Sequence, residues 1–154
     1  MKKIGTTGLK LLKITHITLA VMWIGGAFSM ILTLLLTEVN DASSMLLRAK
    51  VLKTIDDNLI IIGANGCVIT GLIYEAFTNW GFFKHRWIIA KWGLTVFMVL
   101  SGTFAMGPCV NSNIFITDIA QYTQNVERTI FWGWIQIVML FLVIILSVWK
   151  PKFK

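Results

Sequence analysis

Apolar residues fill four long stretches of the chain, and the charged residues stand almost entirely between them. No Asp, Glu, Lys or Arg occurs in residues 14–37, 58–74, 92–117 or 129–149. A helix of roughly 20 apolar residues crosses a bilayer core about 30 Å thick. We therefore predict a single transmembrane domain over residues 1–154. Its spanning helices lie at about residues 9–36, 59–77, 87–107 and 130–149.

The connections between these spans are short, which predicts an all-α, four-helix bundle of up-down-up-down topology. The first outer connection is long enough to hold a helix of its own. Between Ser43 and Asp57, the residues Leu47, Val51 and Ile55 recur every four positions, with charged residues on the other sides. This spacing predicts a short outer amphipathic helix on the membrane surface, between spans one and two. Pro108 is expected to end span three.

The composition excludes several classes of protein. Hydrophobic residues make up 56% of the chain and charged residues 14%, against about 25% charged residues in an average soluble domain. A soluble enzyme, a secreted disulfide scaffold and a disordered tail are all inconsistent with these values. Because most of the chain is membrane-embedded, we expect membrane lipid around it and either a homo-oligomer or a membrane-protein partner.

The basic residues that give the net charge of +7 are distributed as membrane topology requires, so we expect no nucleic-acid partner. Most basic residues gather at the two termini and around the second connection: Lys2, Lys3, Lys10, Lys13, Lys84, Arg86, Lys91, Lys150, Lys152 and Lys154. By the positive-inside rule, both termini face the cytoplasm. We therefore expect a multi-pass protein of the cell membrane.

Small residues form a strip on the second span. Gly63, Cys67 and Gly71 recur every four positions, which lets another helix approach closely. Glu75 is the next position on this strip, so its carboxylate should point into the bundle. Cys109 lies near the outer end of span three, at a different depth from Cys67, and we expect no disulfide between the two cysteines.

Each of the first three spans carries one ionisable residue on its inward face, at a similar depth: His16, Glu75 and Lys91. The helical period places Trp23 on the same face as His16, and Met98 on the same face as Lys91. An ionisable residue inside a span costs about 2.5–3.5 kcal/mol on insertion, rarely faces lipid and marks a functional site. We therefore treat the three ionisable residues as one constellation.

Two interpretations of this constellation stay open. In the structural one, Glu75 and Lys91 form a buried ion pair, and His16 bonds a carbonyl of a neighbouring helix. In the chemical one, the residues bind a cofactor, because imidazole is a common haem ligand and a bundle core can admit a flat macrocycle.

The second axial ligand of such a haem is either Lys91 or a methionine such as Met22 or Met98. The third alternative is that the haem has no second protein ligand. The other histidine, His85, stands in the basic link and is expected to contact solvent or headgroups.

Two sequence runs carry a resemblance to a known family. Leu12-Lys13-Ile14-Thr15-His16, followed by Trp23-Ile24-Gly25-Gly26-Ala27-Phe28, resembles the first helix of a superfamily of small bacterial membrane proteins. It includes the HemJ-type protoporphyrinogen IX oxidases and CopD-like copper-resistance proteins. Trp87-Ile88-Ile89-Ala90-Lys91-Trp92 similarly resembles the HemJ-type third helix. The resemblance implies that His16 and Lys91 bind haem b.

The chain departs from HemJ-type proteins after Phe28. Ser29-Met30-Ile31-Leu32 stand where that family typically has a Leu-Pro-Arg-like stretch and a further histidine. Whether the chain is an oxidoreductase of the protoporphyrinogen oxidase kind is therefore left open.

The leading hypothesis is a haem b-binding membrane protein with a one-electron redox role and a porphyrinogen or quinone as partner. His16 and Lys91 are its metal ligands, Trp23 packs against the macrocycle, Glu75 tunes the site or relays protons, and Met98 completes the cofactor-binding set. The alternative is a non-redox transport or accessory subunit for a small molecule or copper, with Glu75 and Lys91 as a structural ion pair. A third hypothesis is a copper or proton pathway through His16, Glu75 and Met98.

Overall fold

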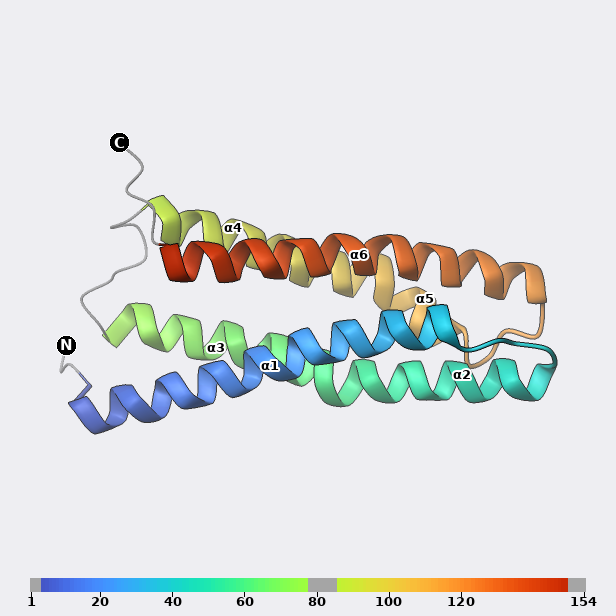
Figure 1. Ribbon diagram of the computed structural model, residues 1–154, viewed down its shortest axis with the longest axis horizontal. Coiled ribbons are helices and arrows are strands. Elements are labelled where there is room, and N and C mark those ends of the chain that lie inside the picture. Colours follow the sequence, from blue (N-terminus) through green and yellow to red (C-terminus); the bar gives the residue numbers. More distant parts are fainter. Residues whose placement is uncertain (1–3, 78–85, 150–154) are drawn as a thin grey trace.

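The computed structural model describes residues 4–77 and 86–149, and the regular structure in these residues is helical throughout (Figure 1). This confirms the all-α prediction. The elements in chain order are α1 (Thr6–Leu36), α2 (Ala42–Ile55), η1 (Asp56–Ile60), α3 (Ile61–Phe77), α4 (Arg86–Ser101), η2 (Gly102–Met106), α5 (Gly107–Ser112) and α6 (Ile119–Trp149). The turns η1 and η2 are π-helical. His85 and the terminal lysines of the charge argument lie outside the described residues.

Four continuous helical rods in the described residues are long and apolar enough to cross a membrane, as predicted. They are Thr6–Leu36, Ala42–Phe77, Arg86–Ser112 and Ile119–Trp149. All run along the long axis of the molecule (Figure 1). The start of α1, the end of α3, the start of α4 and the end of α6 lie together at one end, which we call the terminal end. There α1 packs along α3, and α4 packs along α6.

The second rod differs from the prediction, because the helix expected on the membrane surface continues directly into the spanning helix. The turn η1 joins α2 to α3, and a π-turn absorbs one extra residue without ending a helix. No glycine or proline interrupts the chain between Ile55 and Ile61. The face of α2 that is buried consists of Met45, Ala49 and Leu52, whereas Leu47 and Val51 are exposed.

The third rod also runs further than predicted, because Pro108 does not end it. The turn η2 precedes the proline, and the Gly107 N–H donates to the Gly102 carbonyl. Pro108 then falls in the first turn of α5, where a missing N–H costs no hydrogen bond. The rod consequently reaches Ser112.

The fourth rod begins at Ile119, well before the predicted residue 130. Its first turns look polar in sequence, yet Tyr122 and Val126 on one face are buried with residues of α1, α2 and α5. Arg48 of α2 donates from Nε to the Tyr122 hydroxyl at 2.8 Å. The bundle thus has a second core at the end opposite the terminal end, and this core holds α2 against the other helices.

The core nearer the terminal end contains Trp23, Ala27, Cys67, Met98 and Leu140, among other residues. Here the helix that approaches the strip of small residues is α1. It packs against Gly63 and Cys67, with the Cys67 Sγ 3.9 Å from the His16 carbonyl oxygen. Both cysteines are buried and free.

Candidate functional site

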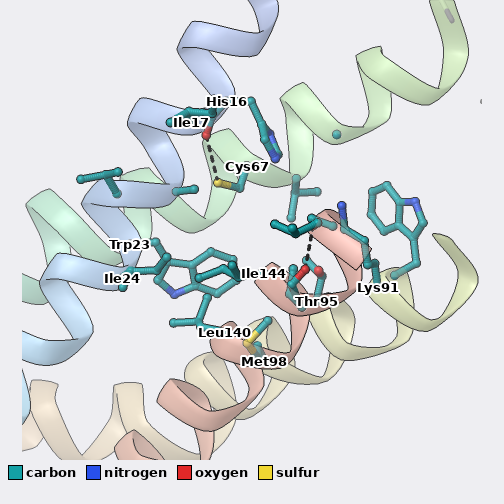
Figure 2. A pocket seen from close by; sticks show the side chains of 18 of the residues that line it. His16, Ile17, Trp23, Ile24, Cys67, Lys91, Thr95, Met98, Leu140 and Ile144 are labelled. Carbon is teal, nitrogen blue, oxygen red and sulfur yellow. Dashed lines mark hydrogen bonds between the residues drawn. The ribbon is translucent and has the colours of Figure 1, made fainter. Parts of the chain in front are cut away.

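A cavity of about 390 Å³ lies among α1, α3, α4 and α6 at the terminal end (Figure 2). All five residues that the sequence singled out for cofactor binding line it: His16, Trp23, Glu75, Lys91 and Met98. Most of the other lining residues are apolar, with Thr95 and Ser147 as exceptions. The three ionisable residues, one each from α1, α3 and α4, therefore line the same cavity. Met22, the other candidate methionine, is not among the lining residues.

His16 enters the cavity wall from α1 (Figure 2). Its Nδ1 lies 2.7 Å from the Oγ1 of Thr70 on α3, and the Tyr74 ring meets the imidazole edge-on at 6.3 Å between centroids. The partner is thus a hydroxyl, where the structural interpretation expected a backbone carbonyl. These contacts hold the imidazole in one orientation between α1 and α3.

Thr70 is a site residue that the sequence analysis did not single out. It is buried and lies one helical turn after Cys67, on the face that carries the strip of small residues. Its position on this inward face is the feature of the sequence that could have identified Thr70 as a site residue. A threonine in a spanning helix usually bonds its own backbone, so the sequence by itself does not identify its partner on α1.

Lys91 projects into the cavity from α4, opposite His16 (Figure 2). Its ammonium lies 5.7 Å from the centre of the Trp87 ring, one turn earlier on the same helix. It is also within electrostatic reach of His16 and Cys67. The amine thus stands at the apolar wall with an aromatic ring beside it.

Glu75 has an indole as its recorded hydrogen-bond partner. The Trp92 Nε1 donates to the Glu75 Oε2 at 2.5 Å. The Trp92 indole lies beside Gly71, where an added Cβ would stand at an ordinary van der Waals distance, 3.8 Å from the Trp92 Cζ2. A charge-assisted hydrogen bond therefore links α3 to α4 at the cavity. The Lys91 ammonium is also within electrostatic reach of Glu75.

The deeper end of the cavity is closed by Trp23, Met98 and Leu140 (Figure 2). Trp23 is 4% exposed and Met98 1%. The Trp23 Nε1 is buried and has no hydrogen-bond partner among the described residues. A buried N–H without a partner costs about 1–3 kcal/mol, so this indole is an unsatisfied group on the cavity wall.

The cavity opens sideways between α1 and α6. Ile17 and Val21 of α1 and Ile144 and Val148 of α6 line it, and their exposed fractions are 51%, 63%, 40% and 79%. Further along, the two helices close on each other where the Phe28 and Phe141 rings meet. The opening therefore lies on an apolar side of the bundle.

The side chains around the cavity suit a metalloporphyrin better than a metal ion held by protein ligands alone. Among the described residues, no group of three or more His, Cys, Asp and Glu side chains could hold a metal ion. A porphyrin supplies four nitrogen ligands itself, so it needs only one or two protein ligands within an apolar pocket. A histidine, a lysine and a tryptophan around an apolar cavity fit that requirement.

The chain matches no family model, no curated protein and no solved structure. The residues around the cavity are therefore the features that point to a function.

Proposed function

We propose that this chain is a haem b-binding integral membrane protein with a one-electron redox role. The observation that supports it is the convergence of His16, Lys91 and Trp23 on one apolar cavity of about 390 Å³. Ligand pockets in proteins hold about 300–1,000 Å³. A bundle core between facing helices is also a usual place for a cofactor.

In this proposal, His16 and Lys91 hold the iron and Trp23 packs against the macrocycle. Met98 forms part of the apolar floor, next to Trp23 (Figure 2). Bound haem supplies an iron that gains and loses one electron. To bind iron, Lys91 must be the neutral amine. The apolar wall disfavours a charge there, whereas the Glu75 carboxylate, which is within electrostatic reach, favours one. Glu75, held by Trp92, stands where it tunes the site or relays protons.

We further propose that the rods cross the membrane up-down-up-down, with both termini in the cytoplasm of a bacterium. The basic residues near the terminal end support this orientation. The cavity then lies in the inner leaflet. The core that contains Tyr122 and Leu52 lies toward the outer side, so α2 stands upright there as part of the second rod.

The partner in this proposal is a lipid-soluble molecule, a porphyrinogen or a quinone. Support comes from the sideways opening between α1 and α6, because its rim residues Val21 and Val148 are apolar and exposed. In a bilayer this opening faces acyl chains, so an apolar molecule reaches the cavity without crossing water.

The absorption spectrum of the detergent-solubilised protein from haem-replete cells tests haem binding directly. We expect a Soret band that sharpens and shifts to longer wavelength on reduction. His16→Ala should lose this band, whereas His85→Ala, which removes the other histidine, should retain it. A colourless preparation would contradict haem binding. Co-purification of that colourless protein with a stoichiometric membrane partner would favour the non-redox subunit.

A further inference from the structure

We infer that Thr70 is a positioning residue, which holds His16 as the Nδ1–H tautomer and so leaves Nε2 as the nitrogen that binds a ligand. The inference concerns two side chains of the cavity wall, His16 on α1 and Thr70 on α3. Its part about ligation rests on the proposed haem binding. Its part about the tautomer does not.

The hydrogen bonds around the Thr70 hydroxyl determine which group donates. The Thr70 Oγ1 lies 2.6 Å from the Gly66 carbonyl oxygen and 3.2 Å from the Cys67 carbonyl oxygen. A carbonyl has no proton to give, so the single hydroxyl proton must lie on this side of Thr70. Without that proton, the Thr70 Oγ1 and the Gly66 carbonyl oxygen would face each other at 2.6 Å as two acceptors.

The contact with His16 then has only one possible direction. The Thr70 Oγ1 has already donated its proton, so at 2.7 Å from Nδ1 it can only accept. Nδ1 must therefore carry the hydrogen. In a neutral imidazole the other nitrogen then has a free lone pair, and Nε2 becomes the ligating atom.

Burial of the Thr70 side chain stabilises these hydrogen bonds. Thr70 is 6% exposed, so water does not compete well for its hydroxyl. The Cys67 thiol also reaches the His16 carbonyl, which ties the same turn of α1 to the same turn of α3. When a histidine binds a metal through one nitrogen, a hydrogen bond from its other N–H orients the ring and raises its basicity. Loss of that hydrogen-bond partner typically lowers metal affinity 10–100-fold.

The tautomer is measured first, in the haem-free protein. His85→Gln leaves His16 as the only histidine of the chain, and ¹⁵N NMR of the labelled ring then reports which nitrogen is protonated. We expect a protonated Nδ1 and an unprotonated Nε2 at a pH where the ring is neutral. A protonated Nε2 would overturn the inference, whatever the protein does with haem.

Variants then test the role of the hydroxyl. Thr70→Val keeps the shape and removes the acceptor, so we expect loss of the pure Nδ1–H tautomer and 10–100-fold weaker haem retention. Thr70→Ser keeps the hydroxyl and should restore both. The matched control is Thr129→Val, because Thr129 is also buried and its hydroxyl donates to the Asn125 carbonyl of its own helix. That variant should change neither measurement.

The outcomes separate this inference from the proposed function. A Nδ1–H tautomer that shifts in Thr70→Val, in a protein that binds no haem, would support the positioning role and contradict haem binding. A haem protein in which Thr70→Val and Thr129→Val retain haem equally and leave the tautomer unchanged would contradict the positioning role alone. If Thr70→Val does not fold, the tautomer of the His85→Gln protein and the Thr70→Ser comparison still decide the question.

Discussion

Gly63 of α3 lies against the backbone of Trp23 on α1, so closely that a Cβ on Gly63 would come within 2.6 Å of the Trp23 nitrogen. The same Cβ would lie 2.8 Å from the Leu19 carbonyl oxygen. Both neighbours are backbone atoms, which cannot move aside as a flexible side chain can. This contact sets the distance between two walls of the cavity, and it places the Trp23 indole at the cavity's deeper end.

Gly63→Ala should therefore destabilise the bundle. We expect a loss of about 1–3 kcal/mol, the usual cost of overpacking a core, measured as reversible unfolding in mixed micelles. Gly25→Ala on α1 is the matched control, because no atom lies within 4 Å of the added Cβ, and it should be neutral or slightly stabilising. Equal stability of the two variants would contradict the close approach of α1 and α3.

Lys91→Ala should change the coordination of the proposed haem without removing it. Without Lys91, His16 alone would hold the iron, so we expect a shift from low spin to high spin in the absorption and paramagnetic resonance spectra. Lys13→Ala, an exposed lysine on α1, should leave the spectrum unchanged. If Lys91→Ala also leaves it unchanged, Lys91 is not a ligand.

Trp92→Phe should weaken the link between α3 and α4 at the cavity. It removes the N–H that the Glu75 carboxylate accepts, and hydrogen bonds to charged groups contribute about 1.5–3 kcal/mol. We expect the loss to fall at the lower end, because Glu75 is half-buried. Glu75→Ala removes the acceptor, so the double variant Trp92→Phe with Glu75→Ala should cost less than the sum of the single changes. Strict additivity of the three unfolding energies would contradict the contact.

Blocking the sideways opening should slow ligand entry from the bilayer. Val148→Trp places a large ring on the rim of the cavity, so we expect slower uptake of haem that has been added to liposomes containing the apoprotein. Val138→Trp is the control, since Val138 is also an exposed residue of α6 and does not line the cavity. Equal uptake rates in these two variants would rule out the opening as the route.

The start of α2 should lose stability in acid through Asp41. Hydrogen bonds from the Ser44 hydroxyl and backbone N–H, and from the Ser43 hydroxyl, lower the pKa of Asp41 to about 2. The unfolded carboxyl has a pKa of about 3.9. Because the folded value is lower, the stabilisation is complete above pH 4 and disappears as the pH falls toward 2.

Hydrogen exchange of the Ser44 amide, which donates to Asp41, measures this effect. Its protection should decrease through that pH window in the native protein. Asp41→Asn keeps a side-chain oxygen at the cap but does not titrate, so its protection should not follow the same curve. Parallel curves for both proteins would show that Asp41 is not responsible.

Much of the architecture could be predicted from the sequence, because lipid leaves the backbone few alternatives. Charge-free apolar stretches of sufficient length must be helical in a bilayer, and the four rods follow. The inward faces could also be predicted, since the helical period aligns His16 with Trp23 and Lys91 with Met98. The rod boundaries could not, because the π-turns at Asp56–Ile60 and Gly102–Met106 have no sequence signature as clear as proline.

The sequence by itself therefore determined an all-helical, apolar chain with four candidate spans and its ionisable residues on inward faces. Only the tertiary structure decided the partners. Thr70 is the partner of His16 and Trp92 that of Glu75, whereas the Trp23 N–H has no partner in the part of the chain that the structure describes. The physical reason is that periodicity assigns a side chain to a face of its own helix. The rotation, depth and separation of neighbouring helices depend on contacts between helices such as that of Gly63 with Trp23, and these select which groups on two facing sides actually meet.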